Sequence, residues 1–218
     1  MLLGSFPKLA VIARGVRERH WQVANWAMRI GDDLDLLPGA GDELPVRVRW
    51  VTLVGRIAAV AVDGERLYVA GGALTAFALA DGSVVWEVEH PAGFALHDSG
   101  GVVLGLDGPQ VVRAFAPWEY ELRVERATGR RISYRELVGG VLPADLVALP
   151  TPPPTRFRIE AGLRETVAFW PDGQVAWQLV VEGAFIDALP PIEANGAIIC
   201  ATSSCHLVVL DPLHPRHG

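Results

Sequence analysis

The sequence predicts an all-β fold built from repeated antiparallel sheets, and three observations predict it. Short runs rich in Val, Leu, Ile and aromatic residues recur along the chain. Gly, Asp or Pro bounds each run, which is typical of strands joined by tight turns. An Asp-Gly turn followed by a Trp-bearing strand occurs at Asp81-Gly82 with Trp86, and again at Asp172-Gly173 with Trp177. Such internal repetition indicates a fold made of similar units.

Composition limits the size and class of the protein. The chain has 218 residues, of which 50% are hydrophobic, so one domain or two small ones can bury a sizeable core. The formal net charge of -6 argues against a general binder of nucleic-acid backbones. Lys8 is the single lysine, which excludes a GxxxxGK phosphate loop and leaves little scope for Schiff-base chemistry. The sequence opens without a secretory leader pattern, so we expect a cytoplasmic protein with no membrane span.

Strands are expected wherever the apolar runs occur, because the runs are too short for ordinary helices. The predicted strands are Arg66–Ala70, Leu74–Leu79, Ser83–Val88, Val102–Leu106, Val111–Phe115, Ala197–Ala201 and Leu207–Leu210. Val16–Ile30 fits both a helical face and a strand alternation, and periodicity does not decide between them. The proline run Pro150–Pro154 predicts a stiff extended linker or loop.

The repeat extends to four related units. Thr128-Gly129 supplies a turn about midway between the two Asp-Gly turns, and Tyr134 lies one place beyond the expected aromatic position. Gly196–Asp211 matches the first half of the unit that begins at Gly64, but the turn and the aromatic strand do not follow it. The last unit therefore needs a strand from elsewhere.

The N-terminal part of the chain offers that strand. Pro45–Leu53 resembles the missing aromatic strand, so we hypothesise that Val46–Val51 completes the last unit. The chain would then have four units over residues 45–218, and residues 1–44 would be an extra element or a partial first unit. In the alternative, residues 8–53 form a unit of their own, which makes five units and leaves the C-terminal unit short.

Turn chemistry and burial explain this pattern. A Gly at each turn supplies the positive φ of a tight hairpin, and the aromatic residue that follows can be buried against a neighbouring sheet. Units of about 40–50 residues with several strands each are able to cover their faces by radial stacking. We therefore predict a small β-propeller of about four to five four-stranded blades, in which an N-terminal strand closes the last blade in the four-blade arrangement.

Two segments resemble a known repeat. LYVAGGALTAFALADGSVVW at Leu67–Trp86 and AIICATSSCHLVVLD at Ala197–Asp211 resemble the repeat of the pyrroloquinoline-quinone-like (quinoprotein-type) β-propeller family. The resemblance implies the propeller fold. Quinone sites of the family's enzymes use vicinal cysteines, whereas Cys200 and Cys205 are not vicinal, so no cofactor is expected. The non-enzymatic branch of the family, which includes outer-membrane assembly propellers, is the nearer one.

The candidate interaction surface combines an insertion, a basic cluster and the proline loop. Ala116–Tyr120 interrupts the repeat and carries Trp118, which could be an exposed anchor or a packing residue. Arginines crowd the next strand and turn, where they could meet an acidic partner or form a solvated face. The candidate surface is Trp118, Tyr120, Arg123, Arg126, Arg130, Arg131, Pro152 and Pro153. Structural roles in the repeat are predicted for Asp81, Gly82, Trp86, Gly129, Tyr134, Asp172, Gly173 and Trp177.

Catalytic and metal chemistry receive weaker support. Residues of metal-ligating type gather at the C-terminal end, but their alignment with ordinary repeat positions favours a structural role. These residues are Cys200, Cys205, His206, His214 and His217. Paired acids could serve a small hydrolase or carbohydrate-binding propeller, yet no spacing fixes two of them together. These acids are Asp32, Asp33, Asp35, Asp63, Glu65, Glu119 and Glu121.

The sequence therefore predicts a non-enzymatic scaffold that binds proteins, as a subunit of a larger assembly. Protein partners are expected, with strand addition at an open blade edge as one mode. Nucleic acid is not an expected partner.

Overall fold

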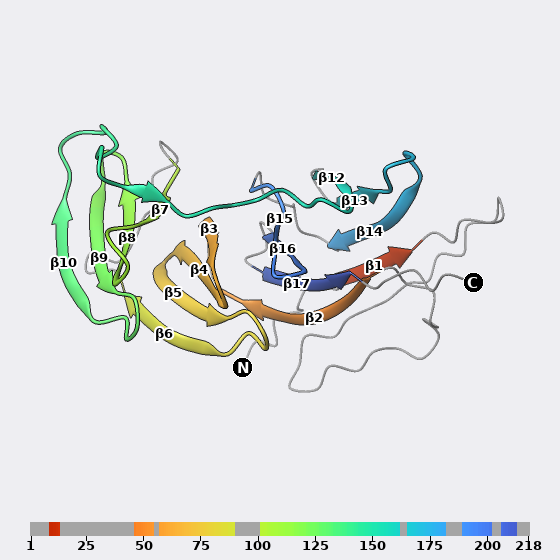
Figure 1. Cartoon of the computed structure of the whole chain (residues 1–218), viewed down its shortest axis with the longest axis horizontal. Coiled ribbons are helices and arrows are strands. Elements are labelled where there is room, and N and C mark those ends of the chain that lie inside the picture. The colour runs from red at the N-terminus through yellow and green to blue at the C-terminus, as the bar shows by residue number, and fades with distance from the viewer. Residues whose placement is uncertain are drawn as a thin grey trace, which may run out of the picture. The chain divides into compact units, whose positions relative to one another are not determined.

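The protein is all-β in the residues that the structure describes. The structure is a computed structural model that describes residues 9–13, 46–54, 57–89, 101–161, 165–181, 189–201 and 206–212 (Figure 1). These residues form antiparallel strands in four separate sheets, and none of them is helical. Val16–Ile30 lies outside the described residues.

Contacts divide the chain into two compact units. The central unit is Thr52–Pro152, and the split unit combines Met1–Val51 with Pro153–Gly218. The boundary after Pro152 falls inside the predicted linker Pro150–Pro154, where a run of prolines favours extended chain.

The first sheet of the central unit is a simple meander. Its strands follow one another in chain order, and each pairs with its neighbour in antiparallel register. The strands are β3 (Ile57–Asp63), β4 (Arg66–Gly71), β5 (Ala73–Ala78) and β6 (Val84–Glu89). The strands predicted at these positions are confirmed.

The second sheet of the central unit has five strands. It runs in the order β10-β9-β8-β7-β11, so the last short strand returns to the edge opposite β10. The strands are β7 (Val103–Leu106), β8 (Val111–Ala116), β9 (Tyr120–Glu125), β10 (Arg131–Glu136) and β11 (Val147–Ala148).

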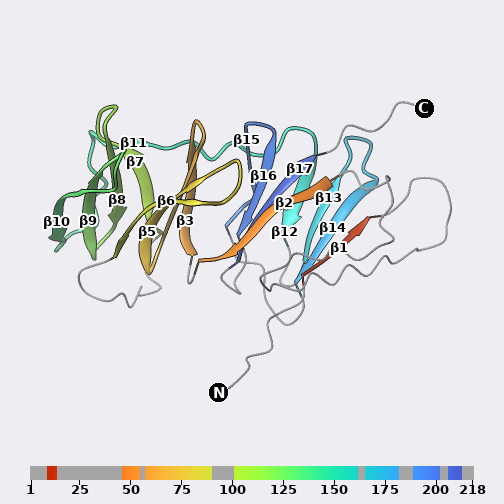
Figure 2. The ribbon, with the colours of Figure 1, turned by 90° about the horizontal axis from the view of Figure 1, so that it is seen from below.

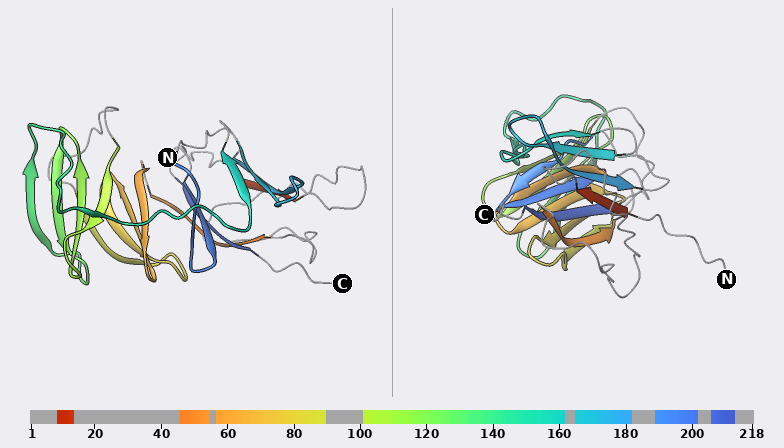
Figure 3. Two further views of the ribbon diagram at one scale, coloured as in Figure 1. Left: turned by 45° about the horizontal axis from the view of Figure 1, so that its top comes forward. Right: turned by 90° about the vertical axis from the view of Figure 1, so that its right-hand side faces the viewer.

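The two sheets of the central unit share one apolar core. The backbones of the two sheets lie next to one another (Figure 3). Alternate side chains of each sheet belong to this core, because successive side chains of a strand lie on opposite faces. Tyr68 and Trp86 of the first sheet join Leu122 and Val124 of the second. Burial of each large apolar side chain contributes about 1.5–3 kcal/mol to stability.

The predicted turns have the backbone that glycine permits. Gly82, Gly129 and Gly173 have φ values of 74°, 73° and 84°, in the left-handed region. Asp81 Oδ1 accepts hydrogen bonds from the Ser83 backbone N–H at 2.9 Å and from its hydroxyl at 2.7 Å. These bonds lower the pKa of Asp81.

The other turns repeat this chemistry. The Gln174 N–H donates to Asp172 Oδ1 at 2.9 Å, and the Arg130 N–H donates to Thr128 Oγ1 at 3.1 Å. The side chain that precedes each glycine therefore fixes the turn that the repeat predicts.

Trp86 links the first sheet to a turn of the second. Its indole N–H donates to the Arg126 carbonyl at 3.0 Å. A Cβ placed on Gly129 would lie 2.7 Å from Trp86 Cγ, so this glycine is required by the packed indole as well as by its φ. Trp177 holds the same register position as Trp86, since Trp86 pairs with Ala76 and Trp177 with Ala168, and the register shifts directly after each alanine. The two Trp-bearing strands therefore pair with their neighbours in the same local register.

One sheet of the split unit receives an N-terminal strand. β12 (Arg158–Ala161), β13 (Glu165–Phe169) and β14 (Val175–Val181) form an antiparallel meander. β1 (Leu9–Ala13) lies beside β14, with Leu9 opposite Val181. Of the predicted extra element 1–44, the described residues are therefore a strand in this sheet.

The other sheet of the split unit contains the predicted closing strand. Its order is β15-β16-β17-β2, with β2 (Val46–Leu53) at the edge beside β17 (Figure 2). Its remaining strands are β15 (Ile192–Ala194), β16 (Ala197–Ala201) and β17 (His206–Pro212). Arg49 Nε donates to Asp211 Oδ1 at 2.7 Å, which joins β2 to β17.

The hypothesis that Val46–Val51 completes the last sheet is confirmed. β1 and β2 belong to different sheets, so the described residues of 8–53 do not form a unit of their own. The number of blades, and their closure into a ring, stay predictions.

Candidate interaction surface

A strained turn exposes a tryptophan on the central unit. The turn joins β8 to β9, and the Glu119 N–H donates to the Ala116 carbonyl at 3.1 Å across it. Pro117 takes the second position of this turn and Trp118 the third, with a φ of 65°. Type II turns need positive φ at the third position and normally place Gly or Asn there. A large side chain in this conformation costs about 1–2 kcal/mol.

Trp118 is the centre of an exposed apolar patch. Its side chain is 67% exposed, and its backbone N–H donates to the Gly139 carbonyl at 3.4 Å. One part of the indole lies against Gly140, where an added Cβ would overlap Nε1 and its neighbours. Val138 and Val141 flank the two glycines and are 97% and 88% exposed. We call Trp118, Val138, Val141 and the half-exposed Leu142 the Trp118 patch.

The patch is carried by a segment that returns across the sheet. This segment, residues 137–149, is called the strap; it leads from the end of β10 to β11 at the opposite edge. The Leu149 N–H donates to the Leu104 carbonyl at 2.8 Å, and β11 pairs with β7. A Cβ on Gly105 would lie 2.7 Å from the Val147 carbonyl oxygen, so Gly105 permits this close approach.

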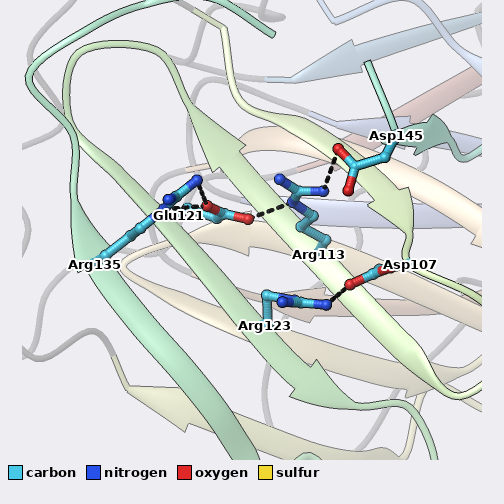
Figure 4. A network of polar contacts seen from close by, with 6 residues as sticks. All are labelled: Asp107, Arg113, Glu121, Arg123, Arg135 and Asp145. Atoms are coloured by element: carbon cyan, nitrogen blue, oxygen red, sulfur yellow. Dashed lines mark hydrogen bonds and ion pairs between the residues drawn. The ribbon is translucent and has the colours of Figure 1, made fainter. Parts of the chain in front are cut away.

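The strap contributes an acid to an ion-pair network whose central pair is buried (Figure 4). Arg113 and Glu121 are each 4% exposed, and Arg113 Nε lies 2.5 Å from Glu121 Oε1. Arg135 pairs with the other oxygen of Glu121. Asp145 of the strap lies 3.2 Å from Arg113 Nη1, and this contact lowers the pKa of Asp145.

The network balances charge on one face of the sheet. Arg113 and Arg123 are direct cross-strand partners, an arrangement of like charges that is unfavourable alone. Glu121 and Asp145 neutralise Arg113, while Asp107 pairs with Arg123. The network was not predicted from the sequence. The signal was present, because Arg113 interrupts the apolar β8 and charged residues alternate along β9, where strands flanked by other strands are expected to be apolar.

The arginine cluster is largely engaged inside the central unit. Arg126 Nη2 lies 2.5 Å from Asp63, and the Arg126 carbonyl also accepts a bond from Arg66. Arg130 lies 3.5 Å from Glu125, whose pKa is lowered by the Thr128 hydroxyl and by Arg130. Arg131 is exposed at the start of β10. The geometry therefore gives Arg123, Arg126 and Arg130 structural contacts.

Tyr120 corrects one prediction, because it is 3% exposed and lies in the core. Its ring stacks on Tyr134 at 6.2 Å between centroids, and burial raises the pKa of Tyr120. Tyr120 follows Trp118 by two residues, so the turn places the Trp118 side chain in solvent and the Tyr120 side chain in the core. Pro152 and Pro153 are exposed at the boundary between the units.

The described residues offer little for metal chemistry. Cys200 is buried opposite Val208, and burial raises its pKa to about 12. His206 is buried on β17, whereas Cys205, His214 and His217 lie outside the described residues. No group of three or more His, Cys, Asp or Glu suited to a metal occurs within the described residues.

The acids considered for hydrolysis are dispersed. Asp32, Asp33 and Asp35 lie outside the described residues. Asp63 and Glu121 each form an ion pair with an arginine, so neither is paired with a second acid as hydrolysis would need.

Within the ranges that the structure describes, no helix is long and apolar enough to cross a membrane.

Comparisons with known proteins give remote similarity only. No family model matches the sequence, and no curated protein matches it. The chain is similar to BamB from Moraxella catarrhalis, with 13% identity, a TM-score of 0.27, and coverage of 71% of this chain and 42% of that one. It is similar to a europium-containing methanol dehydrogenase, with 14% identity, a TM-score of 0.33, and coverage of 66% and 27%.

A third similar structure is the computationally designed Ika8 protein. Identity is 13% and the TM-score 0.27, over 70% of this chain and 45% of that one. The chain spans less than half the length of each of these structures. At these TM-scores the similarity carries no argument about activity or partner, and the relationship to the pyrroloquinoline-quinone-like family stays a prediction.

Proposed function

We propose that this chain is a non-enzymatic protein-interaction module, a scaffold subunit that docks a partner through the Trp118 patch. One observation carries the proposal: the fold holds a bulky aromatic residue in a strained backbone conformation and presents it to solvent. Strain of this kind persists where the surrounding structure imposes it, and it concentrates at functional positions. Tryptophan is also enriched among the residues that dominate binding energy at interfaces.

The surroundings of Trp118 support a docking role. Val138 and Val141 flank the two glycines that contact Trp118, and they add two exposed apolar side chains to the surface that a partner would cover. The strap that carries them is bonded to the turn at Gly139, and Asp145 and β11 hold its far end, so these contacts order the surface before a partner binds. Preorganisation of this kind lowers the entropic cost of association.

Strand addition at the C-terminal sheet is not part of this proposal. The edge of β17 that the sequence left open is occupied by β2 of the same chain. A partner strand is therefore not needed to complete that sheet.

Site-specific photo-crosslinking in cells tests the proposal. A photo-reactive amino acid at position 141 should yield a discrete adduct with another protein, and the Trp118→Ala substitution should abolish that adduct. Position 127 is the matched control, because Ala127 is exposed in the turn at the opposite end of β9. Equal adducts at both positions, or an adduct at 141 that survives Trp118→Ala, would refute the proposal.

A further inference from the structure

The charge around the Trp118 patch selects among possible partners. The turn and the strap that build it, residues 117–119 and 137–149, contain two acids, Glu119 and Asp145, and no Lys or Arg. A third acid, Glu136, directly precedes the strap and follows Arg135, which pairs with Glu121. Asp145 is already paired with Arg113. Among the described residues, no ion pair engages Glu119 or Glu136, so no arginine of the described chain neutralises either charge; Glu136 is exposed, and Glu119 is half-buried.

The indole of Trp118 has room for a flat cationic group. Contact with Gly140 occupies one part of the ring system, and the side chain remains 67% exposed. Cations bind over aromatic faces, and tryptophan is the strongest ring for this contact. Arginine suits such a site better than lysine, because its planar guanidinium stacks on an aromatic face and still donates to a carboxylate.

Glu119 supplies an acceptor in the residue that follows Trp118. Its Oε1 atom is buried, and no hydrogen-bond donor among the described residues reaches it. An acceptor left without a donor away from water is unfavourable. Rotation of the carboxylate would offer this oxygen to a guanidinium that lies over Trp118.

We infer that the partner contributes an apolar segment with an arginine, in which the guanidinium stacks on Trp118 and pairs with Glu119 while apolar side chains cover Val138 and Val141. This inference rests on the proposed function, since it specifies the partner of the same patch. An acidic partner fits less well: the nearby Arg113, Arg123 and Arg135 are already paired with Glu121, Asp107 and Asp145.

Peptide binding to the full chain tests the inference. Three fluorescein-labelled peptides of one length and one valine content, with arginine, lysine or glutamate at the alternate positions, are compared by fluorescence anisotropy. The arginine peptide should bind most tightly, the lysine peptide several-fold more weakly, and the glutamate peptide not measurably. The affinity of the arginine peptide should fall as the salt concentration is raised, because salt screens charges near the surface.

Variants connect the binding to the named residues. Trp118→Ala should weaken arginine-peptide binding by about tenfold or more, as expected for a central aromatic anchor. Glu119→Gln should weaken it several-fold and flatten its salt dependence, while Trp118→Phe should retain part of the binding. Glu65→Gln is the matched control, because Glu65 is an exposed acid in a turn of the other sheet, and it should change nothing. All variants are first shown to melt cooperatively.

The outcomes separate this inference from the proposed function. Equal binding of the glutamate peptide, no binding of any peptide at millimolar concentration, or indifference to Trp118→Ala overturns the arginine assignment. If the adduct at position 141 still forms and depends on Trp118, the docking function stands without that assignment. An adduct that proves to be a second copy of this chain overturns the assignment to a different partner.

Discussion

Replacing Gly129 with alanine should destabilise the protein more than the same change at Gly64. Both glycines have left-handed φ values, 73° at Gly129 and 61° at Gly64, so each alanine adds about 1–2 kcal/mol of backbone strain. Only Gly129 has a packed neighbour: its added Cβ would lie 2.7 Å from Trp86 Cγ, whereas nothing lies within 4 Å at Gly64. Overpacking of this kind costs about 1–3 kcal/mol more.

The comparison isolates the contact between the two sheets. Alanine also restricts the unfolded chain and so adds about 0.4–1 kcal/mol of stability, but this effect is common to both variants and cancels in their difference. The free energy of unfolding of Gly129→Ala should therefore lie about 1–3 kcal/mol below that of Gly64→Ala.

Equilibrium unfolding in urea, followed by far-ultraviolet circular dichroism, measures this difference. The midpoint should shift while the slope stays constant, because a constant slope shows that the surface exposed on unfolding is unchanged. Equal midpoints for the two variants would refute the reasoning, since they would mean that Trp86 does not constrain Gly129.

Three further predictions concern the Trp118 turn and the ion-pair network. Trp118→Gly should be more stable than Trp118→Ala by about 1 kcal/mol in thermal melts, because both variants lose the indole but only glycine relieves the positive φ. A more stable Trp118→Ala variant would contradict the strained turn. Glu121→Ala should lower the free energy of unfolding by about 3–5 kcal/mol, because it leaves Arg113 buried without its close partner. Arg135→Ala should lower it by under about 1 kcal/mol, because the Arg135 side chain is 64% exposed. Similar losses for the two variants would contradict the burial of the Arg113–Glu121 pair. The pKa of Asp145 is lowered in the folded state, so its contribution to stability is present above its unfolded value of about 3.9 and is lost as pH falls through the folded value. Asp145→Asn should flatten the stability profile below about pH 4, and an unchanged acid profile would show that the contact with Arg113 is absent in solution.

Local turn chemistry made much of the fold predictable. The glycines at positions 82, 129 and 173 were identified from the residue before each and the strand after it, and all three have the expected positive φ. The closing strand Val46–Val51 was identified because its aromatic pattern matches the strand that the last unit lacks, and β2 lies at that edge. A few neighbouring residues were enough to identify the glycines, whereas the closing strand was identified by comparing units along the chain.

Contacts across the sheet were not predictable in the same way. The arginines after β8 form a cluster in the sequence, but several of their acids come from elsewhere. Arg123 pairs with Asp107 after β7, Arg126 with Asp63 at the end of β3, and Arg135 with Glu121 of β9. Tyr120 was assigned to the surface because its insertion interrupts the repeat, yet the turn at Trp118 reverses the chain and returns Tyr120 to the core. The exposure of Trp118 depends on Gly139 and Gly140, which no local pattern connects to it.

The position of β2 determines the order in which parts of the chain can fold during synthesis. Arg49 contacts Asp211 across 162 residues of sequence. Likewise, β1 cannot pair until β14 has been made. A chain emerging from the ribosome at about 5–20 residues per second can form the contiguous central unit well before either N-terminal strand meets its partner. During that interval β1 and β2 present unpaired backbone, the kind of edge that recruits other chains. Nascent protein should therefore need protection at β1 and β2 until β14 and β17 have been made.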